Sequence, residues 1–363
     1  MRLLWITGRD IVSDMASTTE ISLATALQEI GVRVLMIHPG LKKNNFSFET
    51  NNISKIKFPG LNTISGAKNI RIMLLEDKFG IDDYDAILVD WRYVPFLNNF
   101  LTKTNIPWHI IDRGPPVNNN FLSWLQRLLW KKSWKIADKY AKSGFIVSKG
   151  HLEYIKKRLT IKLNVKILPA GSNKNIFLQQ RTDIFDEVKM IYIGRIDKNR
   201  DIASIIRLST RLEEVELDHK IDIYGEGDYG GRLKQHALKN KNIKFHGKIE
   251  NKNIQKILSE KHIGIMPMPK KEIWKMGSPL KLSEYIAAGL LIIGPKHEGN
   301  QIIGNESWSL LTNDYDWTIA AAQEIVECRE NWDKFSEAAI ESQKGLEWIE
   351  IAESVKRAIM KKS

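Results

Sequence analysis

Short apolar runs alternate with helical segments along this sequence, and this alternation constrains the fold more than any other feature. RLLWIT at 2–7 precedes a polar loop and an apolar-periodic segment at 21–30, which Gly31 closes before a second run, VRVLMI, at 32–37. A strand, a helix and another strand of this kind open a parallel sheet, because parallel neighbours need a crossover connection. Further strands are predicted at 86–91, 108–112, 144–148 and 165–172.

The same alternation starts again in the second half of the chain. Strands are predicted, with helices between them, at 190–195, 220–228, 242–247, 263–268 and 290–293. We therefore predict the α/β class, with two Rossmann-like, doubly wound domains that face a central cleft. The predicted domains are residues 1–172 and 173–345, and the segment 346–363 forms a C-terminal helix that crosses back to the N-terminal domain.

Composition excludes several classes of protein. The single cysteine, Cys328, excludes a disulfide framework and a cysteine-based metal site, and it fits a reducing cytoplasm. The N-terminal stretch turns polar too soon for a signal peptide, and no apolar window has the roughly 18–20 residues of a membrane span. The net charge of +12 suggests a polyanionic partner.

Most of that charge lies in residues 121–158, which contain ten basic residues and only two acidic ones. On a helical wheel one face is apolar and aromatic and continues as a ladder of lysines: Phe121, Trp124, Leu125 and Leu128, then Lys132, Lys135, Lys139 and Lys142. Trp130 and Trp134 lie on the opposite face, which is typical of core packing. This pattern predicts contact with an anionic membrane surface; the alternative is an ordinary packed helix with solvated lysines. No base-reading module accompanies the charge, so nucleic acid is not expected.

The stretch SPLKLSEYIAAGLLI at 278–292 predicts a helix that feeds a buried strand. Ser278 is predicted to cap this helix, with Pro279 in the first turn. Lys281 and Glu284 place a cation and an anion beside the free N–H groups of the helix start. This combination suits a nucleotide diphosphate joined to a ribose. The alternative is a solvated ion pair between positions i and i+3.

Four segments in this order resemble a known family: YIGRIDKNRDI, IYGEGD, NIKFHGKI and SPLKLSEYIAAGLLI. They look like the C-terminal domain of GT-B-fold retaining glycosyltransferases, closest to glycosyltransferase family 4 (group 1). ADKYAKSGFIVSKGHLEYI and VKILPAGSNKNIF resemble the last elements of the family's N-terminal domain. The resemblance implies transfer of a sugar from a nucleotide-sugar donor to a lipid-linked or glycan acceptor. The protein is expected to be peripheral on the cytoplasmic face of the membrane.

The resemblance also implies the residues of the donor site. Arg195 and Arg200, with Lys198 as a nearby substitute, bind the donor diphosphate, and Arg195 stabilises its charge during catalysis. Glu284 accepts hydrogen bonds from the ribose hydroxyls. The remaining donor-site residues are those of the glycine turn and the helix start: Gly225, Gly277, Ser278, Pro279, Leu280 and Lys281. Because these cations stabilise the leaving group, neither a metal nor another cofactor is expected.

One position departs from the family pattern. The family has a pair of glutamates eight positions apart, but Met276 stands eight residues before Glu284. Either backbone amides around Gly277 hold the transferred sugar, or the protein is a weak or non-catalytic relative. A nucleotide-sugar 2-epimerase of the same fold is a third alternative, although no carboxylate and histidine groups of the kind that it needs precede Glu284.

In such folds the first domain holds the acceptor. Ser17 is predicted to cap the first helix and to offer a donor to the acceptor. WHIIDRGPPV places His109, Asp112 and Arg113 at a strand end that is expected to face the cleft. His109 and Asp112 are therefore candidate catalytic residues, with Asp112 orienting or deprotonating an acceptor hydroxyl. The alternative is that Asp112 and Arg113 only hold the Pro-Pro turn in place.

Overall fold

The computed structural model describes residues 1–14, 17–40, 45–54, 61–76, 80–116, 121–173, 184, 186–301, 308–313 and 315–361. The chain divides into two compact units, which are described separately. Unit 1 consists of Met1–Pro169 and Trp348–Ser363, and unit 2 consists of Ala170–Glu347.

Unit 1 contains a seven-stranded parallel sheet in the order β3-β2-β1-β4-β5-β6-β7. Its strands are β1 (Arg2–Ile6), β2 (Arg33–Pro39), β3 (Glu49–Ile53), β4 (Ala86–Asp90), β5 (Trp108–Asp112), β6 (Ser143–Ile146) and β7 (Val165–Ile167). Leu3 on β1 pairs with Val34 on β2 and with Ala86 on β4. The direction in which strands are added reverses between β1 and β4, and we call this place the crossover point of unit 1.

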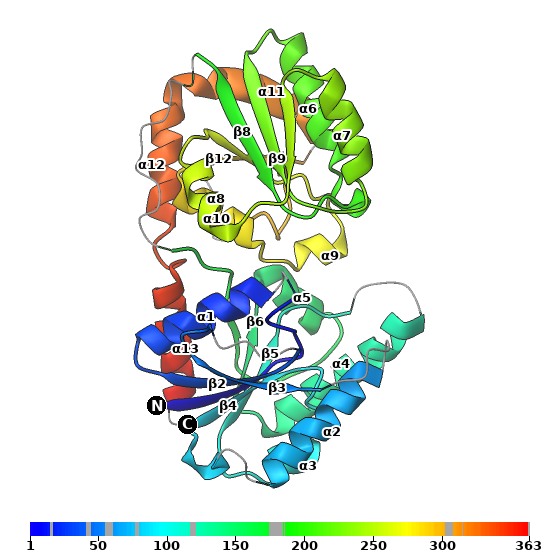
Figure 1. Cartoon of the computed structure of the whole chain (residues 1–363), viewed down its shortest axis with the longest axis vertical. Coiled ribbons are helices and arrows are strands. Elements are labelled where there is room, and N and C mark those ends of the chain that lie inside the picture. The colour runs from blue at the N-terminus through cyan, green and yellow to red at the C-terminus, as the bar shows by residue number, and fades with distance from the viewer. Residues whose placement is uncertain are drawn as a thin grey trace. The chain divides into compact units, whose positions relative to one another are not determined.

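Helices cover both faces of this sheet (Figure 1). They are α1 (Thr18–Glu29), α2 (Leu61–Leu75), α3 (Asn98–Leu101), α4 (Phe121–Tyr140), α5 (Lys149–Lys156) and α13 (Trp348–Met360). The C-terminal helix α13 packs against α1, and its Lys356 Nζ donates to the carbonyl of Ile30 at 2.9 Å. The ammonium group thereby satisfies a free carbonyl at the end of α1. The chain end is thus an integral part of unit 1.

Unit 2 contains a six-stranded parallel sheet in the order β10-β9-β8-β11-β12-β13. Its strands are β8 (Val188–Ile193), β9 (His219–Tyr224), β10 (Ile243–Gly247), β11 (Ile263–Ile265), β12 (Leu291–Pro295) and β13 (Ser309–Thr312). Its helices are α6 (Ala203–Glu214), α7 (Gly230–Lys239), α8 (Asn251–Leu258), α9 (Glu272–Lys275), α10 (Leu280–Ala287), α11 (Trp317–Cys328) and α12 (Trp332–Ser342). The crossover point of unit 2 lies between β8 and β11.

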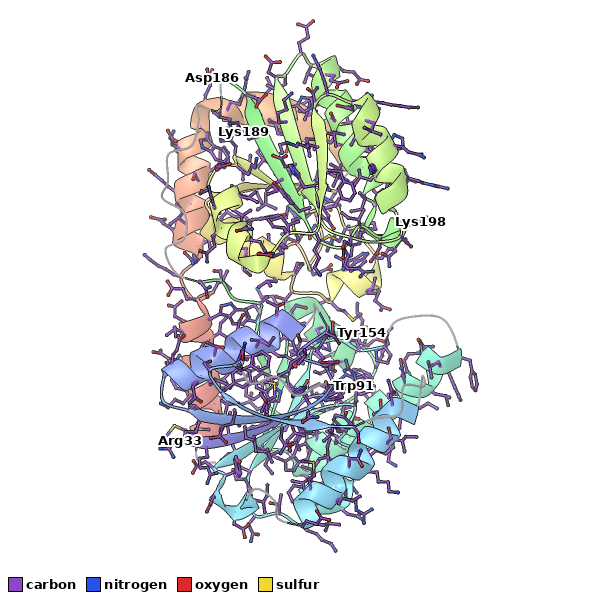
Figure 2. The ribbon with its side chains drawn as sticks, in the orientation of Figure 1. Arg33, Trp91, Tyr154, Asp186, Lys189 and Lys198 are labelled. Carbon is purple, nitrogen blue, oxygen red and sulfur yellow. The ribbon has the colours of Figure 1, made fainter. Side chains whose placement is uncertain are left out.

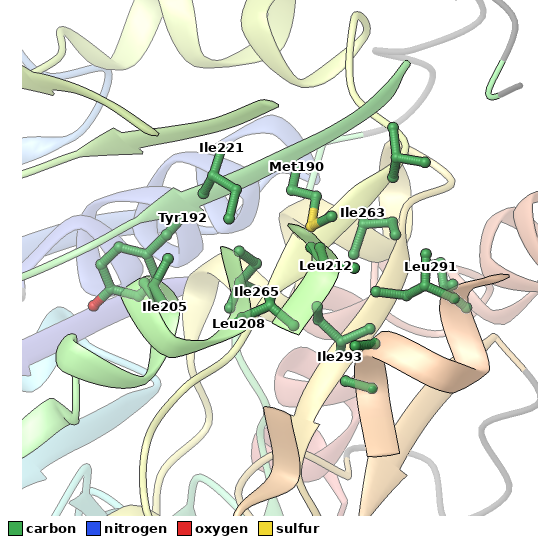
Figure 3. Close-up of a cluster of buried hydrophobic side chains, with 14 of the residues drawn as sticks. Met190, Tyr192, Ile205, Leu208, Leu212, Ile221, Ile263, Ile265, Leu291 and Ile293 are labelled. Atoms are coloured by element: carbon green, nitrogen blue, oxygen red, sulfur yellow. The ribbon is translucent and has the colours of Figure 1, made fainter. Parts of the chain in front are cut away.

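The core of unit 2 has one layer on each face of the sheet, because successive strand residues point to opposite sides. Met190 and Tyr192 pack with α6, α7 and α11 (Figure 3), whereas Ile191 and Ile193 pack with α8, α10 and α12. Both layers are almost fully removed from water. Strands that are apolar on both faces are typical of a parallel sheet covered by helices.

The predicted fold class is confirmed by the two doubly wound sheets and by the return of the C-terminal helix to unit 1. Two strands were not predicted, β3 and β13, and both lie at an edge of their sheet. β3 has the polar sequence ETNNI and lies at the sheet edge, where only one side needs a partner strand. The predicted strand at 165–172 is shorter than expected, because only Val165–Ile167 joins the sheet.

Candidate functional site

Two loops meet at the carboxyl end of β8 in unit 2. The amide of Gly194 donates to the carbonyl of Tyr224 at 3.0 Å, and the amide of Ile196 donates to that of Glu226 at 2.9 Å. Gly225 has a φ of 143°, and a Cβ built on it would lie 1.7 Å from the Gly194 carbonyl oxygen. A larger residue therefore cannot replace Gly225 without separating the loops. The structure gives this predicted donor-site residue a packing role.

Arg195 follows this close approach and is 52 % exposed at its side chain. Its Nε and Nη2 each donate to the carboxylate of Asp197 at 3.1 Å. These hydrogen bonds lower the pKa of Asp197 and raise that of Arg195. Lys198 begins the short 3-10 helix Lys198–Arg200, and its amide donates to Asp228 at 2.8 Å (Figure 2). Asp197 was not among the predicted site residues, because nothing in the sequence marks it as the partner of Arg195.

Arg200 is held by an aromatic side chain. Its guanidinium carbon lies 4.6 Å from the centre of the Trp274 ring, and its Nε lies 4.0 Å from Asp197. The indole Nε1 of Trp274 donates to the carbonyl of Asn199 at 3.1 Å, so the ring is fixed to the loop that it covers. The Nε of Arg200 is buried and has no hydrogen-bond partner among the described residues. Stacking orients Arg200, and its guanidinium also contacts the Tyr192 hydroxyl, so only the donors that are not used there remain for an anion.

The start of α10 differs from the prediction. The helix begins at Leu280 with Pro279 as its N-cap residue, and no side chain caps it. Ser278 Oγ instead accepts a hydrogen bond from the amide of Ala170 at 2.8 Å, and Ser283 Oγ donates to the Ala170 carbonyl at 2.6 Å. The cap assignment of Ser278 is therefore wrong, because a distant segment occupies its hydroxyl. The first-turn amides of α10 are left without a side-chain cap.

Lys281 and Glu284 form an ion pair with Nζ–Oε2 at 2.6 Å, and both side chains are only about one-fifth exposed, at 21 % and 22 %. Tyr285 fixes the helix that carries them. Its hydroxyl oxygen accepts from the amide of Ile193 at the end of β8 at 2.8 Å, and its ring packs where Gly264 has no side chain. The N-terminal turn of α10 is thereby tied to the strand that leads into Arg195.

Trp274 also connects Arg200 to the segment before α10. The amide of Gly277 donates to the Trp274 carbonyl at 3.0 Å, while the Met276 side chain is buried. The Trp274 carbonyl also lies 1.9 Å from a Cβ built on Gly299, in the loop after β12, so only glycine fits there. The contacts of Trp274 join positions that are up to 75 residues apart in the sequence. The sequence therefore did not single out Trp274 or Gly299.

A buried histidine and asparagine shape the same loop after β12. Gly299 donates its amide to His297 Nδ1 at 3.1 Å, so Nε2 carries the proton and donates to the Met268 carbonyl at 3.0 Å. Burial lowers the pKa of His297 and keeps it neutral. The amide nitrogen of Asn300 donates to the carbonyls of Met266 and Pro295, whereas its Oδ1 has no hydrogen-bond partner among the described residues. This loop holds the ends of β11 and β12 together.

In unit 1, His109 is not where the prediction placed it. It is the second residue of β5, pairs with Leu88 and Ser143, and lies toward the amino end of its strand. The ring is fully buried, and its Nδ1 contacts Ser143 Oγ at 2.7 Å. Burial, together with the charges of Lys142 and Lys166, lowers its pKa to about 4. A catalytic role for His109 does not fit this position, because ligands of doubly wound sheets bind at the carboxyl ends of strands.

Asp112 ends β5 but is also fully buried. Its Oδ2 accepts from the indoles of Trp130 and Trp134 at 2.6 and 2.9 Å, and His151 Nε2 lies 3.3 Å away. Oδ1 accepts from the amide of Gly114 at 3.0 Å. Burial alone raises the pKa of a carboxyl group, but His151 and the indoles outweigh it and lower the pKa of Asp112. The carboxylate therefore anchors α4 to β5, and this arrangement favours the turn-holding alternative over a general base.

Ser17 does not offer a free hydroxyl either. Its side chain makes no cap hydrogen bond to α1 and instead donates to the carbonyls of Asp14 and Ile11 at 2.5 and 3.4 Å. Because Ser17 is also buried, it is a loop-stabilising residue in this structure. Arg113 is different, since its side chain is partly exposed at the carboxyl end of β5.

Helix α4 has the two faces that the sequence predicts. Trp130 and Trp134 are fully buried, whereas Trp124 is 48 % exposed. The other apolar residues at the start of α4 and the lysines that follow them are exposed as well: Phe121, Leu122, Leu125, Leu128, Lys132, Lys135 and Lys139. Lys142 lies beyond the end of α4.

Within the described residues no helix has the length and apolarity to cross a membrane. Nor do those residues include a cluster of three or more histidine, cysteine or acidic side chains that could hold a metal ion.

Comparison with known families bears on unit 2. Residues 187–331 match the family model described as "Glycosyl transferases group 1". No curated protein matches the chain in sequence. The matched region includes every residue of the β8 loop, α9 and α10 discussed above.

Solved structures resemble the whole chain. A sucrose-phosphate synthase from Thermosynechococcus elongatus is 16 % identical, with a TM-score of 0.76 over 98 % of this chain and 97 % of that chain. HepE from Anabaena, solved with UDP-glucose, is 13 % identical, with a TM-score of 0.70 over 99 % of both chains. WaaG, described as a glycosyltransferase of lipopolysaccharide biosynthesis, is 11 % identical, with a TM-score of 0.71 over 99 % of this chain and 100 % of that chain. These likenesses establish the GT-B fold.

Proposed function

Because residues 187–331 form a group 1 glycosyl transferase domain within a GT-B fold, we propose that this protein is a retaining glycosyltransferase. It transfers a hexosyl group from a nucleotide-sugar donor to a lipid-linked or glycan acceptor. One observation carries the proposal. Arg195 and Arg200 follow β8 at the crossover point of unit 2, and the contacts of Trp274 and Tyr285 connect this loop and strand to the start of α10. The solved complex of HepE with UDP-glucose supports this choice of donor class.

The chemistry of the donor site follows from its ion pairs. As the sugar leaves, negative charge develops on the nucleoside diphosphate, and preorganised cations stabilise it. Arg195 releases the carboxylate of Asp197 and binds the diphosphate instead. Arg200, which stacks on the Trp274 ring, donates its available N–H groups to the same diphosphate. The uncapped amides at the start of α10 add the positive end of the helix. When the donor binds, the ion pair between Lys281 and Glu284 opens. Glu284 then accepts hydrogen bonds from the ribose hydroxyls, and Lys281 binds the phosphates.

In this proposal the arginines, Lys281 and the helix start replace a divalent cation. Activity should therefore survive chelation. Purified protein is first screened by thermal shift against UDP-, GDP- and other activated sugars, and hydrolysis of the preferred donor is then measured with and without EDTA. Equal rates are expected. Loss of activity on chelation, restored by one divalent metal, would overturn metal independence while leaving the transferase assignment intact.

Met276 bears on whether the protein is catalytic. Its buried side chain stands where the family places the glutamate that contacts the transferred sugar. The amides of Met276 and Gly277 already donate to the carbonyls of Glu272 and Trp274, so in this proposal the amide of Ser278 makes that contact. Donor hydrolysis by the purified protein separates this enzyme from a non-catalytic glycosyltransferase-like subunit, which binds the donor without turnover.

Helix α4 supports attachment to the cytoplasmic face of the membrane. Trp124, Leu125 and Leu128 are exposed apolar side chains that precede the exposed lysines Lys132 and Lys135 on the same helix. An apolar tip followed by cations suits an anionic bilayer, with the indole at headgroup depth. Attachment at this site would bring a lipid-linked acceptor to unit 1.

A further inference from the structure

Five charged side chains gather at the crossover point of unit 1. Arg9 follows β1, Asp90 and Arg92 lie at the end of β4, and Arg113 follows β5. Glu20 reaches the same place from α1. We call these five residues the unit 1 charge cluster. In open α/β sheets ligands bind outside the carboxyl ends of the strands at this kind of position.

Four members of the cluster are paired with one another. Glu20 is 2 % exposed; its Oε2 accepts from the Thr7 hydroxyl at 2.6 Å, and its Oε1 lies 3.2 Å from Arg9 Nε. Arg92 Nη1 lies 3.5 Å from Asp90 Oδ2, and the Arg92 amide donates to Asp90 Oδ1 at 2.9 Å. The charge of Asp90 raises the pKa of Arg92. Both carboxylates are thereby engaged, each with its own arginine.

Arg113 is the exception. Within the described part of the chain its guanidinium makes neither a hydrogen bond nor an ion pair, although Glu20 and Asp90 are near enough to influence it. Burial, reinforced by the charge of Arg9, lowers its pKa to about 10. A guanidinium keeps its proton throughout the physiological range. The protein therefore maintains a partly buried cation whose desolvation the charges of Glu20 and Asp90 offset only in part.

Other acidic groups nearby are already occupied. Asp112 precedes Arg113, but its carboxylate accepts from two indoles and a backbone amide. Asp14 is engaged as well, since its Oδ2 lies 3.5 Å from Arg9 Nη1. The loop after β1 leaves space for the Arg92 side chain because Gly8 has none of its own: a Cβ on Gly8 would lie 2.8 Å from Arg92 Nη1.

The geometry points to an anion-binding site on Arg113, with Arg9 as the neighbouring cation, that recognises a phosphate or carboxylate carried by the acceptor. Both anions match the fork of N–H donors that a guanidinium presents. The acceptor class is then an anionic sugar or a phosphorylated lipid headgroup rather than a neutral glycan. This identification of the acceptor rests on the proposed function, whereas anion binding to unit 1 can be measured without catalysis.

The test uses soluble probes and the whole chain. Binding of glucose 6-phosphate, glucuronic acid and glucose is measured by calorimetry on the parent, on Arg113→Gln and on Arg33→Gln. Arg33 is an exposed residue at the amino end of β2, so its substitution removes the same charge away from the cluster (Figure 2). We expect the anionic probes to bind with affinity that falls as salt rises, and glucose not to bind. Arg113→Gln should weaken anion binding at least about tenfold, and Arg33→Gln should leave it unchanged.

Two further measurements keep the outcome unambiguous. Arg113→Lys retains the positive charge but lacks the paired N–H donors of a guanidinium, so it should bind anions with intermediate affinity. Thermal denaturation verifies that each variant is folded. Competition between glucose 6-phosphate and phosphatidylglycerol vesicles shows which molecule carries the anion. If the vesicles displace glucose 6-phosphate, the anion belongs to a lipid headgroup; if both bind at once, it belongs to a soluble sugar acid or sugar phosphate. Anion binding that is equal in the parent and both Arg113 variants, or equal for glucose and its phosphate, would overturn the inference. Nucleotide binding to unit 2, measured on the same samples, tests the proposed function separately.

Discussion

The two sheets of this protein share one topology but use their crossover points differently. In unit 1 the polar groups are side chains, and the carboxylate of Glu20 is buried among arginines that it holds in place. In unit 2 the loops approach through glycine, at Gly225, and the arginines sit at the surface. Asp197 and Glu284, the carboxylates that pair with cations at the candidate donor site, are both 22 % exposed.

This difference separates a fixed site from an exchangeable one. Removing the partner of a buried charge is expensive, so the Glu20–Arg9 pair in unit 1 stays intact and positions whatever binds beside it. Exposed pairs such as Arg195–Asp197 contribute about 0–1 kcal/mol, so an incoming anion can replace them at little cost. Unit 2 is therefore arranged to exchange internal pairs for a diphosphate, and unit 1 to present Arg113, which makes no ion pair within the described residues.

The largest effect is expected from removing the exchangeable cations. Arg195→Ala combined with Arg200→Ala should lower turnover on the order of 10³-fold or more, because each group stabilises charge that is greatest in the transition state. Donor affinity should fall much less. Steady-state kinetics with the preferred donor, together with calorimetry, measures both quantities.

Arg211→Ala is the matched control for this double variant. Arg211 lies in the same unit in the last turn of α6, outside the β8 loop, and pairs with Glu214 at 2.8 Å. It should keep the turnover of the parent. Equal losses of turnover and donor affinity in the double variant would mean that both arginines act only on the bound ground state.

An intermediate effect is expected in the fixed unit, where His109 links stability to pH. Its pKa is lowered by burial to about 4, below the ordinary 6.5, so the unfolded state binds the proton first as pH falls. Its contribution is therefore fully present above about pH 6.5 and is lost between there and pH 4. The free energy of opening β5 should fall by about 3 kcal/mol over this window. Native-state hydrogen exchange at the amides of Ile110 and Ile111 measures it.

Burial also lowers the pKa of His38, His219 and His297, so the difference between parent and variant isolates His109. His109→Gln keeps a polar side chain of similar reach, and it should remove this part of the pH dependence. A variant with the same slope as the parent would show that His109 is already protonated in the folded protein near pH 6.

The effect expected to be smallest at physiological ionic strength concerns α4, because salt screens it. Changing Lys132, Lys135 and Lys139 to Gln should cost about 3 kcal/mol of attraction to anionic vesicles at low ionic strength, about 1 kcal/mol for each lysine. The loss should shrink as salt rises, since these lysines are exposed. Co-sedimentation with phosphatidylglycerol vesicles measures it, and the exposed Lys239 of unit 2, changed to Gln, serves as the control. Unchanged sedimentation of the triple variant would make α4 a packed helix only.

Much of the fold was predictable because the central strands are apolar on both faces and alternate with helices. β2 and β8 could be located from their own residues, and the burial of Trp130 and Trp134 followed from helical spacing. The strand β3 could not be located in this way. Its polar sequence carries no periodic signal, and its place depends on pairing with β2.

The candidate site was predictable only where a residue acts through its position in a motif. Arg195 and Glu284 were located from the order of the four segments. Ser278 was assigned as a cap because its sequence context fits one, but its hydroxyl accepts from Ala170, 108 positions away. Trp274 and Asp197 could not be assigned, because their contacts exist only once the loops of unit 2 have come together.

The central claim is that unit 2 binds a nucleotide through Glu284, and calorimetry of the preferred nucleoside diphosphate tests it most directly. Glu284→Ala is compared with Glu214→Ala, which breaks another i,i+3 ion pair in the same unit. Each variant is titrated with the nucleotide and with its 2′,3′-dideoxy form. We predict that Glu284→Ala and removal of the hydroxyls each cost about 1.5–3 kcal/mol, that the two losses do not add, and that Glu214→Ala binds like the parent. Unchanged affinity in a folded Glu284→Ala protein would contradict the account.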